Sequence, residues 1–77
     1  MQQETIYTLL QQHFTNCQVS VELEGNSANI QIIGEIFAGL NKVKRQQMVY
    51  KAIGNLITDG CLHAVSINTY TTAEIGN

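Results

Sequence analysis

Apolar and polar positions follow two different periods in the first half of the chain. Over residues 4–14 the apolar side chains recur every three or four positions, which predicts an amphipathic helix. Over residues 19–23 apolar and polar residues alternate, and a second alternation starts at Ile30. Alternation of this kind is typical of half-buried strands. The turn-forming residues 24–27 therefore predict an antiparallel hairpin, with a loop slightly longer than minimal.

The second half of the chain has the pattern of a long helix followed by a strand. Asn41 is suited to cap the helix, and an apolar stripe at helical spacing follows it. The stripe consists of Val49, Ile53, Leu56 and Ile57. Gly60 can adopt the left-handed conformation that ends many helices. Residues 62–70 then predict a third strand, and residues 71–74 resemble the start of a last helix.

These elements predict a single domain of the α/β (α+β) class over residues 1–77, because a chain of this length forms one domain at most. Their order is helix, strand, strand, helical region, strand. Since a helical crossover leads to the last strand, that strand should lie parallel to its neighbour. The expected architecture is a three-stranded mixed sheet with helices on one face.

The charges of the chain are segregated along the sequence. The formal net charge is -2, yet a short segment holds all four basic residues and none of the six acids. These basic residues are Lys42, Lys44, Arg45 and Lys51. Such a block is either a solvated helix face or a surface that binds nucleic acid or a protein partner. The absence of any acid within it favours the binding surface, because no neighbour on the helix neutralises the charges.

A helical wheel divides the basic block into two pairs. Lys42 and Arg45 fall close to the apolar stripe, whereas Lys44 and Lys51 fall on the opposite face. Two explanations remain open for the first pair. Either the helix bends before Gly54, or the two side chains run along apolar surface and emerge at its edge.

The histidines and cysteines are the candidates for metal chemistry. His13 lies on the apolar side of the first helix and is interpreted as a structural residue. His63 stands at the start of the third predicted strand, two residues after Cys61, so both side chains would face the same way in an extended segment. Cysteine and histidine are the usual ligands of soft or borderline metals. His63 is therefore the candidate ligand and Cys61 a further one, against the alternative of a hydrogen-bonded histidine beside a buried thiol.

Other functional classes find little support in the sequence. No combination of acid, base and nucleophile suggests catalysis, so a non-enzymatic role is expected. No apolar run reaches membrane-spanning length, and the two cysteines match no disulfide-rich pattern, so we expect a cytoplasmic protein.

Several motifs together resemble those of the BolA-like family, and most of all its IbaG branch. They are Phe37-x-Gly39, Val43-Lys44-Arg45-Gln46-Gln47, Val49-Tyr50 and Leu62-His63-Ala64-Val65-Ser66-Ile67. The similarity extends over nearly the whole chain. It implies a domain similar to a class II KH module, with the order α-β-β-α-α-β, which agrees with the pattern of the elements.

The resemblance also implies a role beside monothiol glutaredoxins in the binding, trafficking or sensing of iron-sulfur clusters. In such complexes a [2Fe-2S] cluster is shared with the glutaredoxin and glutathione, and the BolA-like partner supplies the histidine at the position of His63. No cofactor would then be tightly bound to this chain alone, which would be a monomer or weak homodimer. Members of the family are also described as transcription regulators, so DNA binding through the KH-like basic helical region is the alternative function.

The chain departs from the family pattern at the second cluster ligand. Many relatives carry a histidine or cysteine in the loop between the first two strands. Here that loop is Gly-Asn-Ser-Ala-Asn, and the matching position is Asn29. An amide is a poor iron ligand compared with a thiolate or an imidazole. The second ligand is therefore open, with Cys61 and Cys17 as substitutes that no family pattern supports. A variant of the cluster hypothesis is that the chain is a docking scaffold, which binds the glutaredoxin without sharing a cluster.

Overall fold

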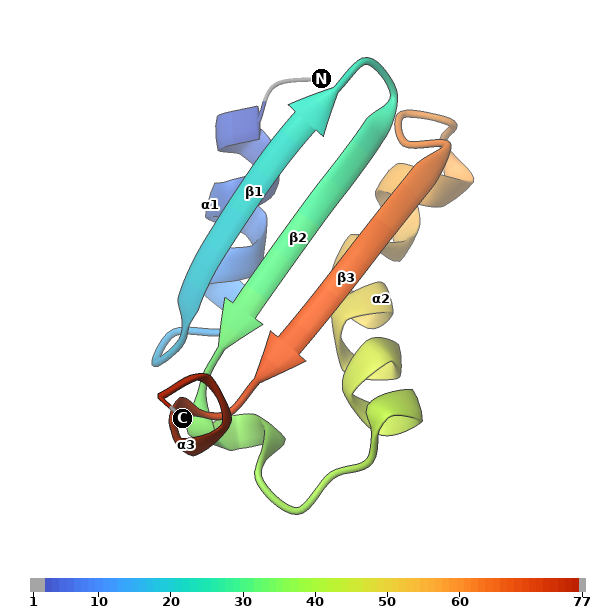
Figure 1. Cartoon of the computed structure of the whole chain (residues 1–77). Helices are drawn as coiled ribbons and strands as arrows, with labels where there is room; N and C mark the ends of the chain where they lie inside the picture. The colour runs from blue at the N-terminus through green and yellow to red at the C-terminus, as the bar shows by residue number, and fades with distance from the viewer. Residues whose placement is uncertain (1–2, 77) are drawn as a thin grey trace.

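The structure is a computed structural model and describes residues 3–76. Its elements follow one another as α1 (Gln3–His13), β1 (Gln18–Glu24), β2 (Ser27–Ile33), the 3₁₀ helix η1 (Glu35–Phe37), α2 (Lys42–Thr58), β3 (Ala64–Tyr70) and α3 (Thr72–Ile75). Figure 1 shows them as one sheet with the two long helices behind it. The predicted α+β class and element order are confirmed, with a 3₁₀ turn as the first of the two successive helices. The helix start expected at residues 71–74 is α3.

The sheet has the predicted mixed topology. Its strand order is β1-β2-β3, with β1 antiparallel to β2 and β2 parallel to β3. The third strand begins at Ala64, two residues later than expected. The reason is that Leu62 is bonded back to the last turn of α2: its N–H donates to the Leu56 carbonyl, and its side chain is buried in the core.

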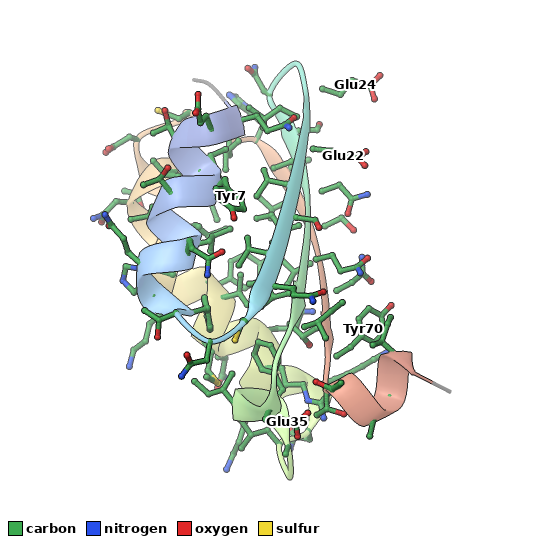
Figure 2. The ribbon with its side chains drawn as sticks, turned by 90° about the vertical axis from the view of Figure 1, so that its left-hand side faces the viewer. Tyr7, Glu22, Glu24, Glu35 and Tyr70 are labelled. Atoms are coloured by element: carbon green, nitrogen blue, oxygen red, sulfur yellow. The ribbon has the colours of Figure 1, made fainter. Side chains whose placement is uncertain are left out.

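The core lies between the sheet and the two long helices. Figure 2 shows α1 on one side of the sheet, while Glu22, Glu24 and Tyr70 project from the other side. The most deeply buried large side chains are Phe37, Ile6, Leu10, Ile30, Ile32, Ile53, Leu62 and Val49. The uncovered face is mostly polar, which is the pattern expected when one face of a sheet remains in water. Among the elements described in residues 3–76, the short α3 is the helix that lies on that side, at the end of the sheet (Figure 2).

The β1–β2 connection is shorter than the sequence predicts. Glu24 pairs with Ser27, so the turn contains only Gly25 and Asn26. Gly25 has a φ of 61°, a positive value that glycine adopts without steric cost. The φ of Asn26 is not positive. A positive φ at the first turn position alone is the pattern of a type II′ hairpin turn, whose twist matches that of the strands. The expected longer loop is therefore wrong, and residues 27–29 belong to β2.

Both ends of α2 follow the predicted capping chemistry. At its start, the Asn41 side chain accepts a hydrogen bond from the Lys44 N–H at 2.9 Å. At its end, Gly60 has a φ of 78°, which permits the left-handed termination. The helix is continuous from Lys42 to Thr58, with Val49 and Ile53 fully buried on the predicted apolar stripe.

Candidate functional site

His63 lies in the short connection between α2 and β3, next to the β1–β2 turn. Its backbone N–H donates to the Asn26 carbonyl at 2.9 Å, which fixes the connection against the hairpin. The side chain is exposed, and within residues 3–76 its ring makes no hydrogen bond to another residue. Figure 1 shows the start of β3 and the hairpin turn at the same end of the sheet. The exposed side chain of His63 is therefore available to an external group.

Cys61 is close in sequence but differs from His63 in its surroundings. Its N–H donates to the Leu56 carbonyl at 3.0 Å as part of the helix end, and the residue is half-buried. Residues 61 and 63 are bends rather than parts of a strand. The expectation that both side chains face the same way assumed an extended segment, and that assumption is wrong.

The structure moves the candidate loop ligand away from Asn29. That residue lies inside β2, paired with Glu22 on one side and with Ser66 on the other. It is not a loop residue, and the hairpin residue beside His63 is Asn26 instead. Neither asparagine offers the thiolate or imidazole that iron prefers.

Cys17 is excluded as a substitute ligand by its distance from His63. It lies just before β1, in contact with Gly34 at the far end of β2, whereas His63 lies beside the start of β2. The 7 residues of β2 separate the two positions, which at about 3.3 Å per residue is roughly 20 Å. Burial also raises the pKa of the Cys17 thiol, which disfavours the thiolate form that binds metal.

The donor set therefore fits a shared cluster and does not fit a resident one. Within the described residues 3–76, no three histidine, cysteine, aspartate or glutamate side chains gather where they could hold a metal ion. A [2Fe-2S] cluster needs four ligands, and His63 is one exposed donor. Such a residue can complete a cluster whose other ligands come from elsewhere.

The basic block is divided between solvent and an internal ion pair. Lys42, Lys44 and Lys51 are exposed on α2. Arg45 is not, because its side chain is 11% exposed and makes a two-pronged ion pair with Glu74 of α3 at 2.8 and 3.3 Å. Its Nε also donates to the Leu40 carbonyl at 2.9 Å. Arg45 therefore does not emerge into water as the edge explanation expected but is held by Glu74, whereas Lys42 is exposed.

Glu74 is the residue that sequence reasoning missed. The hydrogen bond from Arg45 and the backbone N–H of Thr71 lower the pKa of Glu74 from its ordinary 4.5 to about 2. Thr71 and Glu74 also form a reciprocal capping box at the start of α3. A sequence signal existed, since a threonine followed three residues later by glutamate is the capping-box pattern. The partner of Glu74 was hidden because Arg45 is 29 residues away.

His13 differs from its predicted position on the apolar side of α1. The residue is exposed, and its Nδ1 donates to the Leu9 carbonyl one turn earlier at 3.0 Å. His13 is the last residue of α1, after which the backbone turns toward β1. This local bond gives His13 a structural contact without placing it in the core.

Comparison with known proteins identifies the family. A family model described as BolA-like protein matches residues 11–74. The acid stress protein IbaG of Escherichia coli (strain K12) is 36% identical over 74 residues, which cover 96% of this chain and 88% of that protein.

Solved structures agree with the sequence comparison. BolA1 from Arabidopsis thaliana is 26% identical with a TM-score of 0.81, covering 94% of this chain and 93% of that one. A BolA homologue from Coxiella burnetii has a TM-score of 0.84 at 24% identity, covering 100% of this chain and 99% of that one. This similarity is evidence for the fold alone. None of the helices described in residues 3–76 is long and apolar enough to cross a membrane. With the predicted resemblance confirmed by sequence and by fold, the chain belongs to the BolA-like protein family.

Proposed function

We propose that this chain is a non-enzymatic partner of a monothiol glutaredoxin and completes a shared [2Fe-2S] cluster through His63. The observation that carries the proposal is the exposure of the His63 ring, which has no internal hydrogen bond among residues 3–76. The role itself is the one that the family resemblance implies. Among residues 3–76 no three potential ligands gather into a metal site, which agrees with a cluster held mainly by the partner.

The contribution of this chain is to hold one imidazole in a fixed place. The backbone around His63 is restrained by two sets of hydrogen bonds. The His63 N–H donates to the Asn26 carbonyl, and the two preceding N–H groups donate to the Leu56 carbonyl at the helix end. Backbone restraint of this kind lowers the entropy lost when the side chain binds. When bound, the cluster supplies redox or transfer chemistry, and an imidazole in place of a thiolate raises its reduction potential.

The test is reconstitution with a monothiol glutaredoxin, glutathione, iron and sulfide, followed by visible circular dichroism. We expect the wild-type chain to change the cluster spectrum of the glutaredoxin and His63→Ala to leave that spectrum unchanged. His13→Ala is the matched control, because it removes an exposed imidazole at the opposite end of the sheet. His13→Ala should behave as the wild type does.

Two outcomes would contradict the proposal. If His63→Ala gives the wild-type spectrum and affinity, His63 is not a ligand. If the chain binds the apo-glutaredoxin equally well with and without iron, and His63→Ala does not weaken that complex, the chain is a docking scaffold. A titration of apo-glutaredoxin by isothermal calorimetry, run beside the spectroscopy, separates these results.

A further inference from the structure

An apolar groove flanked by lysines crosses the N-terminal half of α2. It has a volume of about 710 Å³ and is lined by Leu40, Lys44, Gln47, Met48, Tyr50 and Lys51. Its lining is mostly apolar, and Tyr50 is 42% exposed although it is a large aromatic residue. A contiguous exposed apolar surface with a polar rim is a common mark of an interaction site. Hereafter this hollow is called the lysine-flanked groove.

The groove continues beyond α2. Met48 and Lys51 also line a second hollow, which reaches Phe14 and Ile36, and those two residues line a third hollow beside α3. Ile36 is 50% exposed at the junction. Because neighbouring hollows share lining residues, they follow one another around the end of the molecule that carries η1 and the start of α2. A path of this shape suits an extended chain better than a compact ligand.

The charges along the groove select an acidic occupant. Lys44 and Lys51 are exposed, and no acidic side chain lines the α2 hollow or the neighbouring hollow that contains Ile36 and Met48. Glu35 lines the hollow beside α3, so the preference for an acidic occupant belongs to the part of the path along α2. Arg45, by contrast, is already paired with Glu74 and lies outside the groove lining. The two lysines thus keep their charge for an external group, in a chain whose formal net charge is -2. The flexible Met48 side chain can adapt to different apolar groups.

We infer that the lysine-flanked groove binds an extended segment of a partner protein that presents large aliphatic and acidic side chains on the same face. The aliphatic side chains would lie on Met48 and Tyr50, and the carboxylates would meet Lys44 and Lys51. At about 3.3 Å per residue, roughly six residues cross the 20 Å width of the molecule. This inference does not rest on His63, since the groove lies roughly 10 to 20 Å from the C-terminal end of α2 along the helix axis.

The test is a titration of the ¹⁵N-labelled full chain with short acetylated peptides, followed by NMR chemical shifts. The first peptide carries glutamate and leucine in turn at every second position, with glutamine between them, so that both kinds of side chain share one face. The second peptide has lysine for glutamate, and the third has serine for leucine. We expect saturable shifts at Leu40, Met48 and Lys51 with the first peptide only. Charge reversal in Lys44→Glu or Lys51→Glu should weaken its binding about threefold to tenfold.

Matched variants separate the groove from its surroundings. Lys42→Glu carries the same charge reversal on the same helix outside the groove lining, so binding should stay within about twofold of wild type. Tyr50→Ser should weaken binding, whereas Val43→Ser, which removes a residue 64% exposed outside the lining, should not. His63→Ala should leave peptide binding unchanged, so failure of the cluster proposal and failure of this one are distinguishable.

Three results would overturn the inference. The first is no saturable shift with the acidic aliphatic peptide. The second is equal binding of the lysine peptide, because charge selection is then absent. The third is equally tight binding of the serine peptide together with displacement by duplex DNA, because α2 is then a plain electrostatic surface that uses no apolar contact.

Discussion

At the residue scale, Gly34 shows how one missing side chain shapes this end of the fold. The residue is buried in extended backbone, with a φ of -174°, so its backbone conformation does not require glycine. The requirement is space, because a Cβ built on Gly34 would overlap the Cys17 Sγ and lie 3.1 Å from the Cys17 Cβ. The contact explains why Cys17 is half-buried, and burial raises the pKa of its thiol.

We therefore expect Gly34→Ala to destabilise the protein by about 1 to 3 kcal/mol, the usual cost of overpacking. The measurement is urea unfolding followed by circular dichroism. Cys17→Ala in the same chain should restore part of the loss, since it removes the sulfur but leaves the Cβ contact.

Gly54→Ala is the matched control for this substitution. Gly54 lies within α2, and an added Cβ there would meet nothing within 4 Å. The same chemical change should stabilise the chain by about 0.5 to 1 kcal/mol through helix propensity. A Gly34→Ala variant as stable as the wild type would show that the strand ends relax freely around Cys17.

At the element scale, the sequence predicts best where the signal is local. The cap at Asn41, the stop at Gly60 and the stripe through Val49 each depend on a few neighbouring residues, and each is confirmed. The pairing of Arg45 with Glu74 was not predictable in this way, because the two residues are 29 positions apart and lie on different helices. The position of His63 just before β3 was predictable from the strand pattern. Its contact with Asn26 was not, because that contact depends on which residues form the hairpin turn.

The attachment of α3 depends on a carboxylate, so it should respond to acid. Because the pKa of Glu74 falls from 4.5 to about 2 on folding, the ion pair contributes stability above pH 4.5, and that contribution is lost as the pH falls toward about 2. We expect Glu74→Gln to lower the melting temperature at pH 7. The difference from wild type should shrink below pH 4.5 and vanish near pH 2.

Melting curves at several pH values between 7 and 2 check this prediction. Glu22→Gln is the control, because Glu22 is an exposed carboxylate without an ion pair among residues 3–76. Its melting temperature should follow that of the wild type throughout. A Glu74→Gln difference that stays constant down to pH 2 would show that Arg45 does not hold α3 through charge.

At the scale of the whole molecule, the two candidate surfaces lie at opposite ends of the sheet. His63 stands beside the hairpin turn, and the lysine-flanked groove begins near η1 (Figure 1). Both can therefore be occupied at once, which suits a small protein that links two partners. The uncovered sheet face between them is polar and carries Glu22 and Glu24 (Figure 2).

The same charge distribution bears on the alternative function, DNA binding. Of the four basic residues, Arg45 is neutralised by Glu74, which leaves three exposed lysines within a chain of net charge -2. With three phosphate contacts, the slope of log K against log salt is no steeper than about -2.7. No two glycines are three residues apart, so the G-x-x-G loop by which KH modules approach a nucleic-acid backbone is absent from the sequence.

We expect duplex DNA to bind weakly at low salt, without sequence preference, and with a dissociation constant above about 100 μM near physiological salt. Fluorescence anisotropy of two labelled duplexes of unrelated sequence, titrated at several salt concentrations, measures both properties. Reversal of Lys42, Lys44 and Lys51 to glutamate should abolish the low-salt binding, whereas His63→Ala should not change it. Submicromolar binding of one duplex at physiological salt, with a slope steeper than three lysines can produce, would instead establish a DNA-binding regulator. In that case residues outside the basic block would have to contact phosphate, and the polar face of the sheet would be the surface left to examine.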